Sequence, residues 1–141
     1  MSLRDVYVFL NRAHSIDRRI QTLCYKREGF LSCLLPKALT PKAVQVQEST
    51  PGDKLSEIMA EVQLIEQEIN RLLNEKARAI REIVETVEKL DREEERLVLI
   101  GFFVSRRTMT DLAEEMHYSV QGVYTLRRRG MTKIKALLEN E

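Results

Sequence analysis

The chain has 141 residues, of which 43% are hydrophobic and 32% are charged, and its formal net charge is +1 at pH 7. This length suits one compact domain, or a small domain joined to an extended helical part. The longest uncharged runs, such as 97–105, are far too short to span a membrane. Arg4 and Asp5 lead into an amphipathic pattern rather than a secretory signal, so we expect a cytoplasmic protein without a membrane partner.

Charge is divided unevenly along the chain. Residues 1–35 carry six basic and three acidic side chains, 55–90 carry five basic and eight acidic, and 119–141 carry five basic and two acidic. A near-neutral total with a basic C-terminal segment fits a protein that meets phosphate with one face only. Cys24 and Cys33 have neither CxxC nor metal-site spacing, which predicts free thiols in a reducing compartment.

The segment 3–27 has an apolar stripe at alternating spacings of three and four, which predicts one amphipathic helix. The stripe consists of Val6, Phe9, Ala13, Ile16, Ile20 and Leu23. Basic residues lie away from this stripe, and we interpret them as a solvated face, with binding to nucleic acid or an anionic membrane as the alternative. Residues 28–35 either continue this helix or fold back on it.

Prolines 36, 41 and 51 predict a flexible linker at about 36–54, because proline disfavours helix both at its own position and before it. The segment 55–90 then keeps a three-four apolar rhythm, which predicts a helix of roughly 54 Å. Such a helix cannot bury its stripe alone. We therefore expect residues 1–90 to form an antiparallel, coiled-coil-like helical hairpin whose leftover apolar strip recruits a second subunit.

The segment 91–107 predicts a strongly apolar helix and a basic loop. Asp91 is the expected N-cap, and the acidic residues 93–95 would interact favourably with the positive end of the helix dipole. Gly101 interrupts the apolar run, which indicates that a neighbouring helix approaches closely there. The inward side of this helix should pack beneath the two helices that follow.

Two helix starts lie eleven residues apart in the last third of the chain. Thr108 is the expected N-cap of the first helix, with Asp111 completing a capping box. His117 interrupts this helix, and Ser119 is the expected cap of the second. The inward face of the second helix is predicted to be Val123, Leu126, Gly130, Met131 and Ile134. The pattern predicts a helix-turn-helix within a domain that spans residues 91–141.

This arrangement resembles region 4 of bacterial sigma factors, whose helix-turn-helix reads promoter DNA. The resemblance rests on Thr108, Asp111, Leu112, Ala113, Glu114, Glu115, Met116, Tyr118, Ser119, Val123, Tyr124 and Leu126. The full layout is similar to the ArpU and RinA-like late transcriptional regulators of phages and prophages of low-GC Gram-positive bacteria. The resemblance implies an all-α fold, regulation of late genes, and a contact with RNA polymerase.

Three positions depart from the sigma pattern. His117 stands where glycine commonly supplies a left-handed turn residue. Gly122 and Gly130 lie inside the second helix, where glycine weakens helical order. Gly130 is expected at a close helix contact, and Gly122 at a close approach to the DNA backbone.

The helix 120–138 is expected to enter the major groove of double-stranded DNA. Its outward N-terminal face carries the candidate base-contacting residues Val120, Gln121, Tyr124, Thr125 and Arg128, beside the capping Ser119. Gln121 can pair with adenine and Arg128 with guanine, while Val120 or the Thr125 methyl can meet a thymine methyl. The candidate phosphate contacts are Arg106, Arg107, Arg127, Arg129, Lys133 and Lys135. The alternative is that these arginines only solvate an exposed helix.

No motif of an enzyme, metal site or cofactor site is recognisable in the sequence. We therefore expect a sequence-specific DNA-binding regulator of phage or prophage transcription that is not an enzyme and needs no cofactor. A first alternative is a DNA-packaging component of the small-terminase kind. A second is an interaction protein that docks on polymerase and not on DNA.

Overall fold

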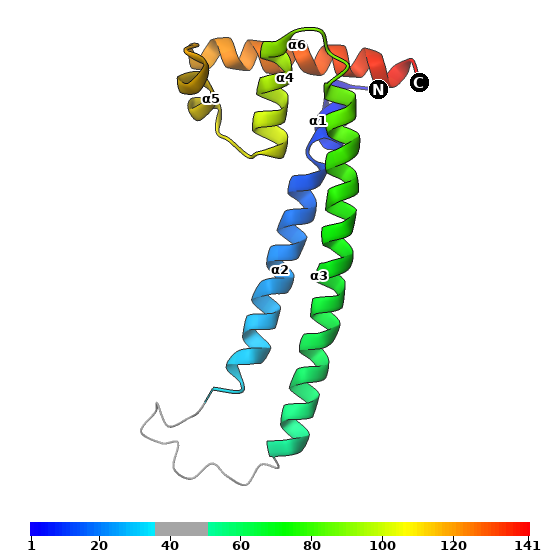
Figure 1. Ribbon diagram of the computed structural model, residues 1–141, viewed down its shortest axis with the longest axis vertical. Helices are drawn as coiled ribbons and strands as arrows, with labels where there is room; N and C mark the ends of the chain where they lie inside the picture. The colour runs from blue at the N-terminus through cyan, green and yellow to red at the C-terminus, as the bar shows by residue number, and fades with distance from the viewer. Residues whose placement is uncertain (36–50) are drawn as a thin grey trace. The chain divides into compact units, whose positions relative to one another are not determined.

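The computed structural model describes residues 1–35 and 51–141, and every regular element among them is helical (Figure 1). The elements are α1 (Leu3–Leu10), α2 (Arg12–Ser32), α3 (Pro51–Val87), α4 (Glu93–Leu99), the π-helical turn η3 (Ile100–Val104), α5 (Met109–Met116) and α6 (Val120–Glu139). The all-α prediction is confirmed for these residues. None of the helices in the described ranges is long and apolar enough to cross a membrane.

The predicted single helix over 3–27 is divided at Asn11. Ser2 begins α1 with a capping box to Asp5. The helix ends at the C-cap Asn11, whose backbone leaves the helical conformation (φ −91°, ψ 7°) and whose N–H makes the last helical bond, to the Tyr7 carbonyl at 2.8 Å. The division lets α1 pack against α6, which buries Val6 and Leu10 completely. The helix α2 then continues to Ser32, so most of the segment 28–35 extends the helix.

The predicted linker at about 36–54 lies mostly outside the described residues. Residues 36–50 lie outside the described part of the chain, but 51–54 already belong to α3. Proline is tolerated in the first turn of a helix because its missing N–H would have no partner there. The helix α3 ends at Val87, three residues before the predicted end.

Residues 18–74 form one compact unit, built from parts of α2 and α3. Its buried side chains are Leu23, Val62, Ile65, Ile69 and Leu72, which belong to the predicted apolar stripes. Arg27 and Glu66 form an ion pair at 3.6 Å between the two helices. Alternating apolar spacing on both helices thus produces a shared core within this unit.

Residues 1–17 and 75–141 form the second compact unit, so the predicted boundary at residue 90 does not coincide with the division into units. One core cluster joins α1, the end of α3, α4, η3 and α6: Val6, Leu10, Ile83, Val87, Leu90, Leu99, Phe103, Met131 and Ile134. A second cluster joins α4, α5 and α6: Val98, Met109, Leu112, Ala113, Val123 and Leu126. Phe102 packs against both clusters.

Two glycines mark close helix contacts in this unit. A Cβ added to Gly130 would lie 2.9 Å from Leu99 Cδ1, and one added to Gly101 would lie 2.7 Å from Leu112 Cδ2. Both distances are too short for ordinary packing. The close approaches predicted at these two positions are therefore present, and they bring α6 onto α4 and α5 onto η3.

We predict that Gly130→Val lowers the unfolding free energy by about 1–3 kcal/mol, because overpacking forces Leu99 or the helix backbone to move. Urea denaturation followed by circular dichroism measures the change. Thr132→Val places the same side chain on the exposed side of α6 and should change stability by less than about 0.5 kcal/mol. Equal stability of the two variants would contradict the close contact.

Candidate nucleic-acid interface

The end of α5 and the start of α6 are set by three local backbone features. Thr108 Oγ1 accepts the Asp111 backbone N–H at 3.0 Å, which is one half of the predicted capping box. His117 adopts the left-handed conformation (φ 60°, ψ 40°), as its place in the sequence predicted. Ser119 Oγ accepts the Gly122 N–H at 3.0 Å and caps α6. The turn between the helices is therefore built from residues 117–119.

The inner face of α6 is the predicted one, since all five of its residues are buried. On the opposite side, Gln121, Thr125 and Arg128 follow each other at helical spacing. Gln121 and Arg128 are exposed, and Thr125 is half-buried with its hydroxyl donating to the Gln121 carbonyl at 3.1 Å. Val120 and Tyr124 are also exposed beside them. The structure thus gathers the five candidate base-contacting residues on the outer side of α6.

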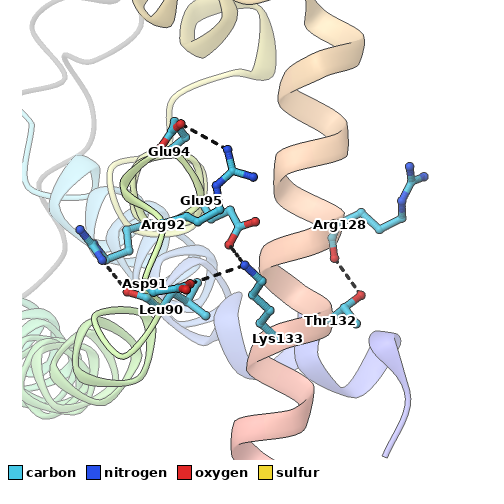
Figure 2. Close-up of polar contacts among 9 residues, drawn as sticks. Leu90, Asp91, Arg92, Glu94, Glu95, Arg128, Thr132 and Lys133 are labelled. Atoms are coloured by element: carbon cyan, nitrogen blue, oxygen red, sulfur yellow. Dashed lines mark hydrogen bonds and ion pairs between the residues drawn. The ribbon is translucent and has the colours of Figure 1, made fainter.

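Lys133 has a structural partner that the sequence analysis did not predict. Its Nζ lies 2.8 Å from Glu95 Oε1 and 3.6 Å from Asp91 Oδ1 (Figure 2). Glu95 is completely buried, and its second oxygen accepts no hydrogen bond from the described residues. Figure 2 shows Lys133 turned toward these acids while Arg128 points away from them. Lys133, predicted to contact phosphate, therefore neutralises a buried carboxylate.

Arg127 is also engaged within the protein. Its guanidinium carbon lies 4.9 Å from the ring centre of Phe102 and 4.9 Å from that of Tyr124. Both distances fall within the range of favourable cation–π contact. The predicted contact of Arg127 with phosphate would therefore have to coexist with these two aromatic contacts or replace them.

The two basic residues before α5 face acidic groups. Arg106 lies 3.2 Å from Asp17, which also pairs with Lys76 at 2.8 Å. Arg107 lies 3.5 Å from Glu115. Arg106 has a positive φ of 61°, which is uncommon for a residue other than glycine. Both arginine side chains remain about half exposed, so phosphate can reach them.

The start of α4 differs from the prediction, because Arg92 and not Asp91 is the N-cap and no side chain caps the helix. Asp91 lies one residue too early and pairs with Lys133 instead. The first turn of α4 holds Glu93, Glu94 and Glu95. Acidic side chains in a first turn interact favourably with the positive end of the helix dipole. A backbone hydrogen bond and the Arg92 side chain lower the pKa of the Glu94 carboxyl.

The space around Gly122 is limited by neighbouring side chains of the same chain. An added Cβ would lie 3.1 Å from Ser119 Oγ and 3.4 Å from Tyr118 Cδ2. An added Cβ would therefore require a small shift of the Ser119 or Tyr118 side chain, and the close approach of Gly122 to DNA stays a prediction.

Within the described part of the chain, Arg128, Arg129 and Lys135 form no ion pair. No group of His, Cys, Asp or Glu side chains in residues 1–35 and 51–141 is placed to hold a metal ion. Comparison with protein-family models, curated proteins and solved structures found no match to this chain.

Sequence reasoning missed the roles of Glu95 and Phe102. Glu95 is four residues before the buried Leu99, so helical spacing alone places it on the inward side of α4. Phe102 follows Gly101 inside a π turn, whose wider winding is not visible as an apolar period. Only the first of these two roles had a signal in the sequence.

We predict that Lys133→Met lowers stability at neutral pH, because it leaves the buried Glu95 carboxylate without its cation. The hydrogen bond from Lys133 to Glu95 raises the lysine pKa above its ordinary value of 10.5. The stabilisation is therefore complete below 10.5 and is lost as the pH rises through the higher pKa of the folded protein. Urea unfolding of the natural protein and of Lys133→Met as a function of pH measures the difference.

The matched control is Lys135→Met, which removes a cation from the same helix without touching Glu95. It should leave stability nearly unchanged. A Lys133→Met protein as stable as the natural one at neutral pH, or a deficit that persists undiminished far above 10.5, would contradict the ion pair.

Proposed function

We propose that α5, the turn 117–119 and α6 form a helix-turn-helix that binds double-stranded DNA in a sequence-specific manner. The observation that carries this proposal is the outward face of α6. It presents Gln121, Thr125 and Arg128 at successive turns, beginning two residues after an exposed, serine-capped helix N-terminus. An N-terminal helix face of this kind is what enters a major groove.

The chemistry of this face fits the edges of bases. A glutamine can bond adenine at N6 and N7, and an arginine can bond guanine at O6 and N7. Val120 and the Thr125 methyl offer apolar contacts to thymine methyl groups. Gln121 and Arg128 are therefore the residues we propose to read sequence.

Phosphate contacts would surround this face. Arg129 and Lys135 have no acidic partner among the described residues, and Ser119 lies at the positive end of the helix dipole. Arg106 and Arg107 can exchange Asp17 and Glu115 for phosphate oxygens, since both side chains are half exposed. Such contacts fix the orientation of a protein on the duplex without reading its sequence.

We further propose a cytoplasmic regulator of phage or prophage late genes that contacts RNA polymerase. In this proposal, 91–141 has the sigma region 4-like arrangement and the N-terminal helices form a coiled-coil-like hairpin. The support is the resemblance of residues 108–126 to sigma region 4. A ring of subunits in solution would favour the packaging alternative instead.

A second copy of the chain is the partner we propose for α3. Leu55, Met59 and Leu73 lie on one side of this helix, and each is 46–47% exposed. Contiguous exposed apolar patches mark association surfaces, and Leu55 and Met59 are neighbours one turn apart on this face. Light scattering after size-exclusion chromatography should therefore show a dimer, and Met59→Lys with Leu73→Lys should shift it to monomer. A strict monomer of the natural protein at high concentration would refute this.

The test of the proposed function is selection of bound fragments from random duplex DNA, followed by affinity measurements on the selected duplex at several salt concentrations. Arg128→Ala or Gln121→Ala should each weaken specific binding by about 1–3 kcal/mol and relax preference at one base position. Lys135→Ala should weaken binding to all sequences alike and reduce the salt slope by about 1.

Arg81→Ala is the control, because Arg81 is an exposed cation of α3 outside the proposed interface. It should bind as the natural protein does. If the natural protein binds no duplex at low salt, the proposal fails. If it binds but Arg128→Ala and Gln121→Ala keep full affinity, α6 is not the reading helix.

A further inference from the structure

Arg127 forms the centre of a stack between η3 and the outer side of α6. The guanidinium carbon lies over the ring of Phe102 and also over the ring of Tyr124, 4.9 Å from each ring centre. A planar guanidinium can cover both rings at once, whereas an ammonium group cannot. Arg127 therefore links a half-buried phenylalanine to an exposed tyrosine.

Phe102 also contacts aromatic side chains of the core. Its ring meets Phe103 edge-on, with centres 4.9 Å apart and planes at 88°, and Phe103 meets Tyr7 of α1 in the same way at 5.3 Å and 75°. Phe103 is almost completely buried. Edge-to-face pairs at these distances are favourable. A continuous row of side chains thus runs from α1 through the core to Arg127, and ends at Tyr124.

Tyr124 is the exposed end of this row, with 46% of its surface accessible. An exposed tyrosine on a helix ordinarily samples several rotamers and loses that freedom on binding. Here the Arg127 guanidinium lies over the ring, a contact that favours one orientation of the ring before any partner arrives. Tyr124 lies one turn after Val120 and three residues after Gln121, within the face proposed to meet DNA.

We propose that Arg127 is a positioning residue, which holds the Tyr124 ring for an apolar contact with a thymine methyl group and does not itself neutralise a phosphate. Aromatic rings make such contacts in the major groove. This inference rests on the proposed function. It assigns to Arg127 a role different from that of its neighbours Arg128 and Arg129, which have no aromatic partner among the described residues.

The deciding variant is Arg127→Lys, which keeps the charge but cannot cover both rings. A positioning role predicts that Arg127→Lys weakens binding to the selected duplex about threefold to tenfold while the salt slope stays unchanged. In a Tyr124→Ala background the same substitution should have no further effect. Replacing the thymines by deoxyuridine one at a time should reveal one position at which the natural protein is weakened but the Tyr124→Ala variant is not, while positions read by Val120 or Thr125 affect both proteins alike. Arg81→Lys is the control for an arginine-to-lysine exchange elsewhere.

A phosphate role predicts the opposite pattern. Arg127→Lys would then bind normally, Arg127→Leu would reduce the salt slope by about 0.9, and its effect would add to that of Tyr124→Ala. That result overturns the inference, as does full affinity of Tyr124→Ala, or an equal response of the natural protein and Tyr124→Ala to deoxyuridine at every thymine position.

A second readout needs no DNA and separates this inference from the proposed function. In NMR spectra of the full chain, the Arg127 side-chain protons should be shifted upfield by the two ring faces. Phe102→Leu and Tyr124→Ala should each remove part of that shift. Unshifted Arg127 protons overturn the stack whether or not duplex DNA is bound, whereas shifted protons in a protein that binds no duplex leave the stack in place and refute its role toward DNA.

Discussion

The contact between α4 and α6 at Gly130 is the constraint on which the C-terminal helices depend. With no side chain at this position, Leu99 and Glu95 of α4 lie directly against the α6 backbone. The inner face of α6, which includes Val123 and Ile134, is buried by this contact and those beside it. Because a helix has only one opposite side, burial of this face leaves Gln121, Thr125 and Arg128 outward. The proposed DNA-reading surface is thus a consequence of how the helix packs.

The basic residues of α6 divide into two groups with different physical roles. Arg127 and Lys133 are turned toward the α4–η3 segment, where one stacks on Phe102 and the other neutralises the buried Glu95. Arg128 and Arg129 are exposed without acidic partners among the described residues. A count of positive charges therefore overstates how many are free for phosphate. Lys133 keeps 42% of its side chain accessible beside its ion pair with Glu95.

Local signals in the sequence were sufficient for the caps at Thr108 and Ser119, the left-handed His117 and the buried face of α6, because each depends on a few neighbouring residues. The break at Asn11 was not predictable, because it accompanies the packing of α1 against α6, which lies more than a hundred residues later in the chain. The Glu95–Lys133 pair is non-local in the same way. The π turn at 100–104 was not predictable for another reason, because its wider winding is not visible as an apolar period. At the site, the outward face could be predicted, but the internal partners of Arg106, Arg107, Arg127 and Lys133 could not.

The most direct test of the account is to map the backbone amide NMR shifts of the full chain during titration with the selected duplex. If α6 reads the duplex, the largest changes should fall on residues 119–129 and on the loop 105–107. Shifts confined to α2 and α3, with the amides of α6 unmoved while the duplex is bound, would contradict it.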